Sequence, residues 1–313
     1  MADELYDVRN GLALGNFHQA IAESTNAKPP SRKAEEVQAF NIERDALVAQ
    51  AQVGLGQFDI VLGDLKTATA PLLVATRQWA ALNKELRAGA PGDEAFAALA
   101  ALAGESPSGA NASVAVLVAS GSIARGDVSG ALKLAATWAA GIDASKQPRE
   151  AIALRAVACD AYLRMNRVDL AEKEVTAMRD IDDDNVQCIM ANIATALRAG
   201  AKARDRFGEA EILVNELVGR CGQSVSLLNL LALAKIGQGK AQEAETHLLD
   251  AISKRNGDAD TLANLAVCAM QLGKPEQAAR YVSQAKASGS QSEWVKTYAS
   301  MESRFTTAAT MSN

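Results

Sequence analysis

The sequence predicts an all-α solenoid, a stack of helical hairpins, on three observations. Hydrophobic residues make up 49% of the 313 residues but aromatic residues only 4%, so alanine and aliphatic side chains must fill the core. Alanine has the highest helix propensity and lets neighbouring helices approach closely. The 7 prolines stand mostly between periodic apolar segments. These segments recur at a fixed interval, which is typical of repeat architectures.

The repeat is clearest near the C-terminus, where residues 225–256 and 259–290 align with a shift of 34 residues. The matched pairs are Leu228 with Leu262, Leu231 with Leu265, Ala232 with Ala266, Gly239 with Gly273, Ala244 with Ala278, Leu248 with Val282 and Ala251 with Ala285. A helix-turn-helix repeat of this length with small residues at fixed places predicts tetratricopeptide-like hairpins. We expect them to stack into a right-handed solenoid.

Packing explains the residue types in each repeat. Ala232 and Ala244 are placed where the two helices of one hairpin meet, and a larger side chain there would hold the helices apart. Gly239 follows the last periodic residue of the first helix, where glycine adopts the left-handed conformation that ends a helix. Pro275 suits the first turn of the next helix, where its missing N–H is not needed.

The same pattern extends upstream and defines the expected domain organisation. Its segments are a hairpin at 148–178 with its turn at 165–167, helices at about 185–198 and 207–219 whose connecting turn at 199–205 holds a five-residue insertion, hairpins at 111–140 and 35–67, a first turn at Gly15-Asn16, and a helical stretch at 71–103 without an assigned register. Residues 1–305 are therefore expected to form a single solenoid, with a possible joint in the turn-rich segment 104–110. Residues 306–313 are expected to form a flexible tail.

Charge and targeting signals restrict the class of partner. The chain carries 32 basic and 37 acidic residues, a formal net charge of -5, and the basic residues are interspersed with acidic ones. Nucleic-acid-binding proteins normally carry a basic patch, so nucleic acid is not an expected partner. The N-terminus lacks the basic and apolar regions of a signal peptide, and no apolar run approaches the length of a membrane span. We expect a cytosolic protein.

The cysteines predict no metal site and no disulfide framework. Cys159, Cys188, Cys221 and Cys268 are far apart, without the paired spacing of zinc sites. Three of them lie in apolar helical stretches, where a reduced cysteine behaves as a small buried hydrophobe.

The remaining motifs predict no catalytic site and no cofactor. His18 and His247 are the only histidines, with no local sign of catalytic partners. The acidic run at 180–184 lacks the glycine and glutamate of a calcium loop. The GQGK segment at 237–240 lacks the first glycine and the Ser or Thr of a phosphate-binding loop, and it is interpreted as a helix turn.

The first helices of the late repeats carry the candidate binding surface. Residues 226–236 and 261–270 are apolar around nearly their whole circumference, which is usual for a helix covered on all sides. Two explanations are open: tight stacking of the hairpins buries these residues, or a segment of a partner protein covers them. For the second explanation, the predicted partner-binding residues are Leu233, Ile236, Val267, Met270, Asn229 and Leu163.

Several stretches resemble the coatomer epsilon subunit family. They are RMNRVDLAEKEVTAMRDIDDDN at 164–185, the insertion that follows it, the repeat pair at 227–288 and LYDVRNGLALGNFHQAI at 5–21. The resemblance is strongest over residues 160–305. It implies a structural subunit of the COPI vesicle coat that acts in retrograde Golgi-to-ER and intra-Golgi transport. It also implies binding to the C-terminal region of the alpha subunit and to the rest of coatomer, no enzymatic activity, no cofactor, and peripheral association with Golgi membranes and vesicles through the coat.

The repeat alone leaves an alternative function open, a cytosolic tetratricopeptide adaptor or co-chaperone that binds a peptide segment of another protein. Such adaptors clamp a C-terminal carboxylate with a basic, asparagine-containing inner surface. The inner positions of the late repeats are apolar instead, which favours the coat subunit.

Overall fold

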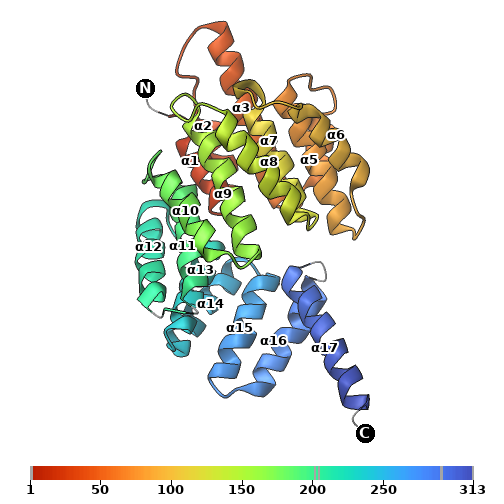
Figure 1. Cartoon of the computed structure of the whole chain (residues 1–313), viewed down its shortest axis with the longest axis vertical. Helices are drawn as coiled ribbons and strands as arrows, with labels where there is room; N and C mark the ends of the chain where they lie inside the picture. The colour runs from red at the N-terminus through yellow and green to blue at the C-terminus, as the bar shows by residue number, and fades with distance from the viewer. Residues whose placement is uncertain (1–2, 201, 204, 290–291, 312–313) are drawn as a thin grey trace. The chain divides into compact units, whose positions relative to one another are not determined.

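The structure is a computed structural model that describes residues 3–200, 202–203, 205–289 and 292–311. These residues form α-helices joined by short connections and no strand (Figure 1). The helices are α1 (Tyr6–Ala13), α2 (Phe17–Asn26), α3 (Ala34–Gly54), α4 (Phe58–Asp64), α5 (Pro71–Arg87), α6 (Asp93–Ala103), the 3-10 turn η1 (Gly109–Asn111), α7 (Ala112–Ala124), α8 (Val128–Gly141), α9 (Pro148–Arg164), α10 (Val168–Arg179), α11 (Val186–Ala199), α12 (Asp205–Cys221), α13 (Val225–Gly237), α14 (Ala241–Lys254), α15 (Ala259–Gln271), α16 (Pro275–Ser288) and α17 (Glu293–Met311). The predicted all-α solenoid is confirmed.

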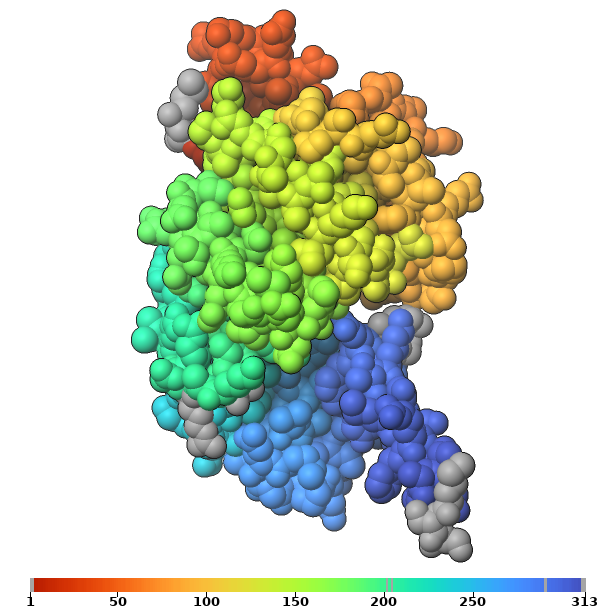
Figure 2. Space-filling view, in the orientation of Figure 1, coloured from red at the N-terminus to blue at the C-terminus, as the bar shows by residue number. Residues whose placement is uncertain are grey.

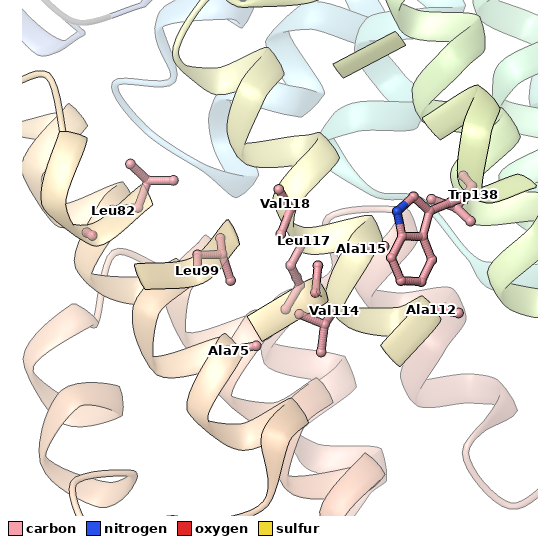
Figure 3. Close-up of a cluster of buried hydrophobic side chains, with 12 residues drawn as sticks. Ala75, Leu82, Leu99, Ala112, Val114, Ala115, Leu117, Val118 and Trp138 are labelled. Atoms are coloured by element: carbon pink, nitrogen blue, oxygen red, sulfur yellow. The ribbon is translucent and has the colours of Figure 1, made fainter. Parts of the chain in front are cut away.

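The contacts between helices divide the chain into two compact units. Unit 1 is Met1–Arg198 and unit 2 is Ala199–Asn313. The division falls at the predicted insertion, of which residues 201 and 204 lie outside the described residues, and not at the joint suggested for 104–110. Segment 104–110 does not separate two cores, because Leu99 and Ala103 before it share one buried cluster with Val114 and Val118 after it (Figure 3).

The turns between the two helices of a hairpin follow one capping pattern. Gly239 has φ +79°, its N–H donates to the Ile236 carbonyl at 3.0 Å, and the Lys240 N–H donates to the Lys235 carbonyl at 2.9 Å. This pair of bonds satisfies the carbonyls at the end of α13 and is the Schellman motif. Asn166 makes the equivalent turn at φ +58°. The predicted turns at both places are confirmed.

A small residue is buried at a fixed place in the second helix of the hairpins. It is the fourth residue of the helix and is alanine in five of them, Ala20 in α2, Ala131 in α8, Ala171 in α10, Ala244 in α14 and Ala278 in α16, while the larger Val61 takes this place in α4. The side chains of the first helix pack directly over this position. Small volume here sets the distance between the two helices of the hairpin.

The C-terminal helix is longer than the sequence predicts. α17 continues to Met311, so residues 306–311 of the expected tail are helical, and residues 312–313 lie outside the described residues. Every residue from 301 to 310 is exposed. The sequence offers no Gly or Pro in this segment to stop the helix, and Ala308 and Ala309 favour its continuation.

Candidate partner-binding surface

Exposed apolar side chains lie on α13 and α15, the first helices of two consecutive hairpins in unit 2. Leu233 is 37% exposed, Val267 41% and Met270 60%. Stacking of the hairpins leaves these three side chains uncovered, so the explanation by burial within the solenoid is wrong for them. The residues beside them in sequence, such as Ala232 and Ala266, are buried. The exposed row is therefore one side of each first helix.

Ile236 is the least exposed apolar residue of this surface. Its side chain is partly buried and packs against a buried cluster that includes Ala232, Leu265 and Cys268. The cluster joins α13 to α15. Ile236 therefore offers only part of its apolar surface to a partner, and the rest fixes the two helices against each other.

Asn229 connects the two first helices by hydrogen bonds. Its amide Nδ2 donates to the Val225 carbonyl at 2.9 Å and to Thr261 Oγ1 at 2.8 Å. Its Oδ1 accepts from Asn264 Nδ2 at 2.9 Å. Both ends of the Asn229 amide are thus used within unit 2, and the residue positions the surface around it.

The surface residues share a register relative to the turn. Ile236 and Leu233 lie three and six residues before Gly239, and Met270 and Val267 lie three and six residues before Gly273. We call the surface formed by these positions the first-helix face. In unit 1, the residues three before the turns at Gly126 and Asn166 are Ile123 and Leu163.

In unit 1, the first-helix face is hollowed into a pocket of about 360 Å³. α7, α9 and α11 line it together with Ala13 at the end of α1, and the lining includes Ile123, Leu163, Met190 and Asp160. Of the six predicted site residues, the structure places Leu163 at this pocket and the other five in unit 2. Ile123 and Met190 were not predicted, although the position of Ile123 three residues before a turn is a signal that identifies it.

A cluster of three charged residues, Lys235, Glu211 and Glu243, lies on and around α13 in unit 2. Lys235 Nζ lies 2.8 Å from Glu211 Oε1 and 2.7 Å from Glu243 Oε2. The hydrogen bonds to Glu211 and Glu243 raise the pKa of Lys235, and the same bonds lower the pKa of both carboxyls. Lys235 is buried. Its charge is consequently compensated within the chain and is not offered to a partner.

Three of the four cysteines in the described helices are buried and unreactive. Burial raises the pKa of the Cys159 and Cys188 thiols to about 11, so both remain protonated and unreactive at neutral pH. Together with Cys268, they are buried as predicted. No group of His, Cys, Asp and Glu side chains within the described ranges has the arrangement of a metal site.

The array of hairpins with an exposed apolar first-helix face defines a tetratricopeptide-like scaffold, a class of repeat protein whose extended surfaces bind other proteins. Solved structures share this fold. A tetratricopeptide repeat protein from Parabacteroides merdae matches with a TM-score of 0.53 and 13% identity over 94% of each chain. The APC/C hetero-tetramer Cut9-Hcn1 matches with a TM-score of 0.59 and 12% identity over 91% of this chain and 52% of that chain.

The family model described as coatomer epsilon subunit matches residues 1–313. Coatomer subunit epsilon-2 of Oryza sativa subsp. japonica is 30% identical over 97% of this chain and 95% of its own length. Coatomer subunit epsilon-1 of Arabidopsis thaliana is 28% identical over 97% and 95%, and coatomer subunit epsilon of Caenorhabditis elegans is 28% identical over 97% of each chain. The chain belongs to the coatomer epsilon subunit family, and it is a structural, non-enzymatic subunit of the COPI coat.

Proposed function

We propose that this chain binds and stabilises the C-terminal region of the coatomer alpha subunit through its first-helix face. In this role it supports retrograde Golgi-to-ER and intra-Golgi transport as a peripheral component at Golgi membranes and COPI vesicles. None of the described helices is both long enough and apolar enough to cross a bilayer, which agrees with membrane association through the coat.

The observation that carries the proposal is the exposed row Leu233, Val267 and Met270. Exposure of single apolar residues is ordinary, but a row on consecutive repeats forms a patch, and such patches mark protein–protein contact sites. Fully burying a Leu, Val or Met side chain contributes about 1.5–3 kcal/mol. Because these side chains are only 37–60% exposed, a partner that covers the row gains about half of this for each, concentrated in a few central contacts.

The unit 1 pocket supports the same mode of binding. It is lined mainly by alanine and aliphatic side chains, with Asp160 and Gln187 among the polar residues at its wall. About 360 Å³ is enough space for one bulky apolar side chain. An extended or hairpin segment of the alpha subunit that binds the first-helix face of unit 1 would place such a side chain in this pocket.

The alternative, an adaptor that clamps a C-terminal carboxylate, lacks its chemistry on α13 and α15. A clamp needs free cationic or amide donors at the inner positions. The Asn229 amide is used by Val225 and Thr261, and Lys235 is held between two glutamates. The exposed positions beside them are apolar.

Cross-linking of the intact coat tests the location of the contact. We expect the exposed Lys240, in the turn between α13 and α14, to cross-link to the C-terminal region of the alpha subunit. Lys173 and Lys254, on second helices α10 and α14, should not. Cross-links from the alpha subunit to the second-helix lysines alone would contradict the proposal.

A further inference from the structure

α17 occupies the position of a first helix in the repeat. α13, α15 and α17 begin at Val225, Ala259 and Glu293, each 34 residues after the last. The third residue of each helix is buried: Leu227, Thr261 and Val295. Val295 shares a buried cluster with Leu262 of α15 and Ala285 of α16, and Ser292 donates to Asp260 Oδ1 at 3.3 Å. α17 thus packs on α15 in the register in which α15 packs on α13.

The side of α17 that would meet a second helix has lost its apolar residues. In α13 and α15 this side carries Leu228, Leu231 and Ala232 and their equivalents Leu262, Leu265 and Ala266, all of them buried. The corresponding residues of α17 are Lys296, Ala299 and Ser300, and all three are exposed. A terminal repeat with a polar or small outer face ends a repeat array and keeps it soluble. On this side, α17 is built to face water.

The first-helix face of α17 keeps an apolar residue at one of its two register positions, Met301, whereas Arg304 stands at the position of Ile236 and Met270. Met301, 34 residues after Val267 and 68 after Leu233, is 63% exposed, and Phe305, one turn further on, is 75% exposed. Tyr298 completes the stripe and stacks on Trp294 with ring centroids 5.0 Å apart. Figure 2 shows the C-terminal half of α17 (dark blue) standing clear of α15 and α16. A helix that only capped the array would not need bulky apolar residues on this exposed side.

We infer that Tyr298, Met301 and Phe305 form the C-terminal end of the partner-binding surface, and that the partner segment on α13 and α15 continues across α17. This inference rests on the proposed function. The stripe fits apolar side chains of the partner segment.

A second copy of this chain is a poorer occupant. The exposed stripe spans about two turns of one helix, and pairing two such stripes buries well under the roughly 1,200 Å² at the lower end of stable interfaces. Continuity with Leu233 and Val267 gives the longer surface that a stable contact requires.

The test compares two charge insertions on the same exposed helix in the full-length chain, titrated with the purified C-terminal region of the alpha subunit. Phe305→Glu should weaken binding by about tenfold or more, whereas Ser303→Glu, on the outer face, should stay within about twofold of wild type. Both residues are exposed, so circular dichroism and thermal unfolding should match wild type.

Leu233→Asp in the same titration separates the two proposals. Wild-type affinity for Phe305→Glu together with lost binding for Leu233→Asp would overturn the assignment of α17 and leave the proposed function standing. Wild-type affinity for Leu233→Asp would overturn the proposed function itself. Equal loss from Ser303→Glu and Phe305→Glu would also overturn the assignment, because the effect would not be specific to the apolar stripe. Dimerisation of the chain alone that Phe305→Glu abolishes would assign the stripe to a second copy instead.

Discussion

Arg149 at the start of α9 donates to Asp3, 146 residues earlier in the chain, with Nη2 and Oδ2 2.9 Å apart. Arg149 Nη1 also lies 3.5 Å from Glu43 Oε1, and Arg9 bridges Asp3 and Glu43 from α1. The hairpins of unit 1 therefore curve until the first meets the fifth. This curvature places Ala13 of α1 at the wall of the pocket formed by α7, α9 and α11.

Removing the Arg149 side chain should loosen the closure of unit 1 without unfolding it. The pairs are partly exposed, so Arg149→Ala should cost less than about 1 kcal/mol of unfolding free energy. Hydrogen exchange should nevertheless become faster in α1, and about 1 M salt should remove the difference from wild type by screening the pairs. Arg167→Ala, which breaks a pair with the neighbouring Asp169, is the control. Unchanged exchange in α1 would show that the cluster does not hold the closure.

Overpacking the small position of a hairpin should destabilise the protein. Ala131 in α8 is fully buried, whereas Ala136 in the same helix is exposed. Ala131→Leu should lower the free energy of unfolding by about 1–3 kcal/mol, and Ala136→Leu should change it by less than about 0.5 kcal/mol. Urea denaturation of the two variants measures the difference. Equal stabilities would mean that the helix spacing is not set at this position.

Substitutions of Asn166 should change the stability of the protein through the backbone conformation of the turn and not through side-chain contacts. At φ +58°, the left-handed conformation costs most L residues about 1 kcal/mol, while glycine adopts it freely. Asn166→Ala should therefore be less stable than Asn166→Gly by about 1 kcal/mol. Thermal unfolding of the pair checks this order. The reverse order would be incompatible with the capping geometry.

Most of the fold could be predicted from signals that lie within a few residues of one another in the sequence. The turn after α13 requires a glycine at Gly239, and the short distance between the two helices requires a small residue at Ala244. Both requirements act within a few residues along the chain, so the sequence predicts both. The sequence does not predict the Arg149–Asp3 hydrogen bond, because this bond depends on the curvature that several hairpins produce together. The length of α17 was missed for a different reason: its last turns have lost the apolar period while keeping helix propensity.

The candidate surface was partly predictable. Leu233, Val267 and Met270 follow from the repeat register, yet only the packing of the neighbouring hairpin decides whether they are covered. Asn229 looks in sequence like a free donor, and its bonds to Thr261 and Asn264 appear only when α13 meets α15. Phe305 was assigned to the solenoid without a role, because only the structure shows that this part of α17 is uncovered.

The Lys235 cluster should make stability depend on pH. The raised pKa of Lys235 means that its contribution is present below its ordinary pKa of 10.5 and is lost as pH rises through the folded-state pKa. The lowered pKa of Glu211 means that its contribution is present above 4.5 and is lost as pH falls through the folded-state pKa. Lys235→Met should cost about 1 kcal/mol at pH 7, and the difference from wild type should shrink towards pH 3. Urea unfolding at both pH values measures it, and a difference that stays constant would contradict the ion-pair account.

The most direct test of the central claim is the affinity of the full-length chain for the purified C-terminal region of the alpha subunit. Met270→Asp, on the first-helix face, should abolish binding with helicity retained, because a buried unpaired carboxylate is costly. Leu249→Asp, at another exposed apolar residue (47% against 60% for Met270) on the second helix α14, should bind like wild type. Native affinity for Met270→Asp, or equal losses in both variants, would contradict the assignment of the first-helix face as the site of partner binding.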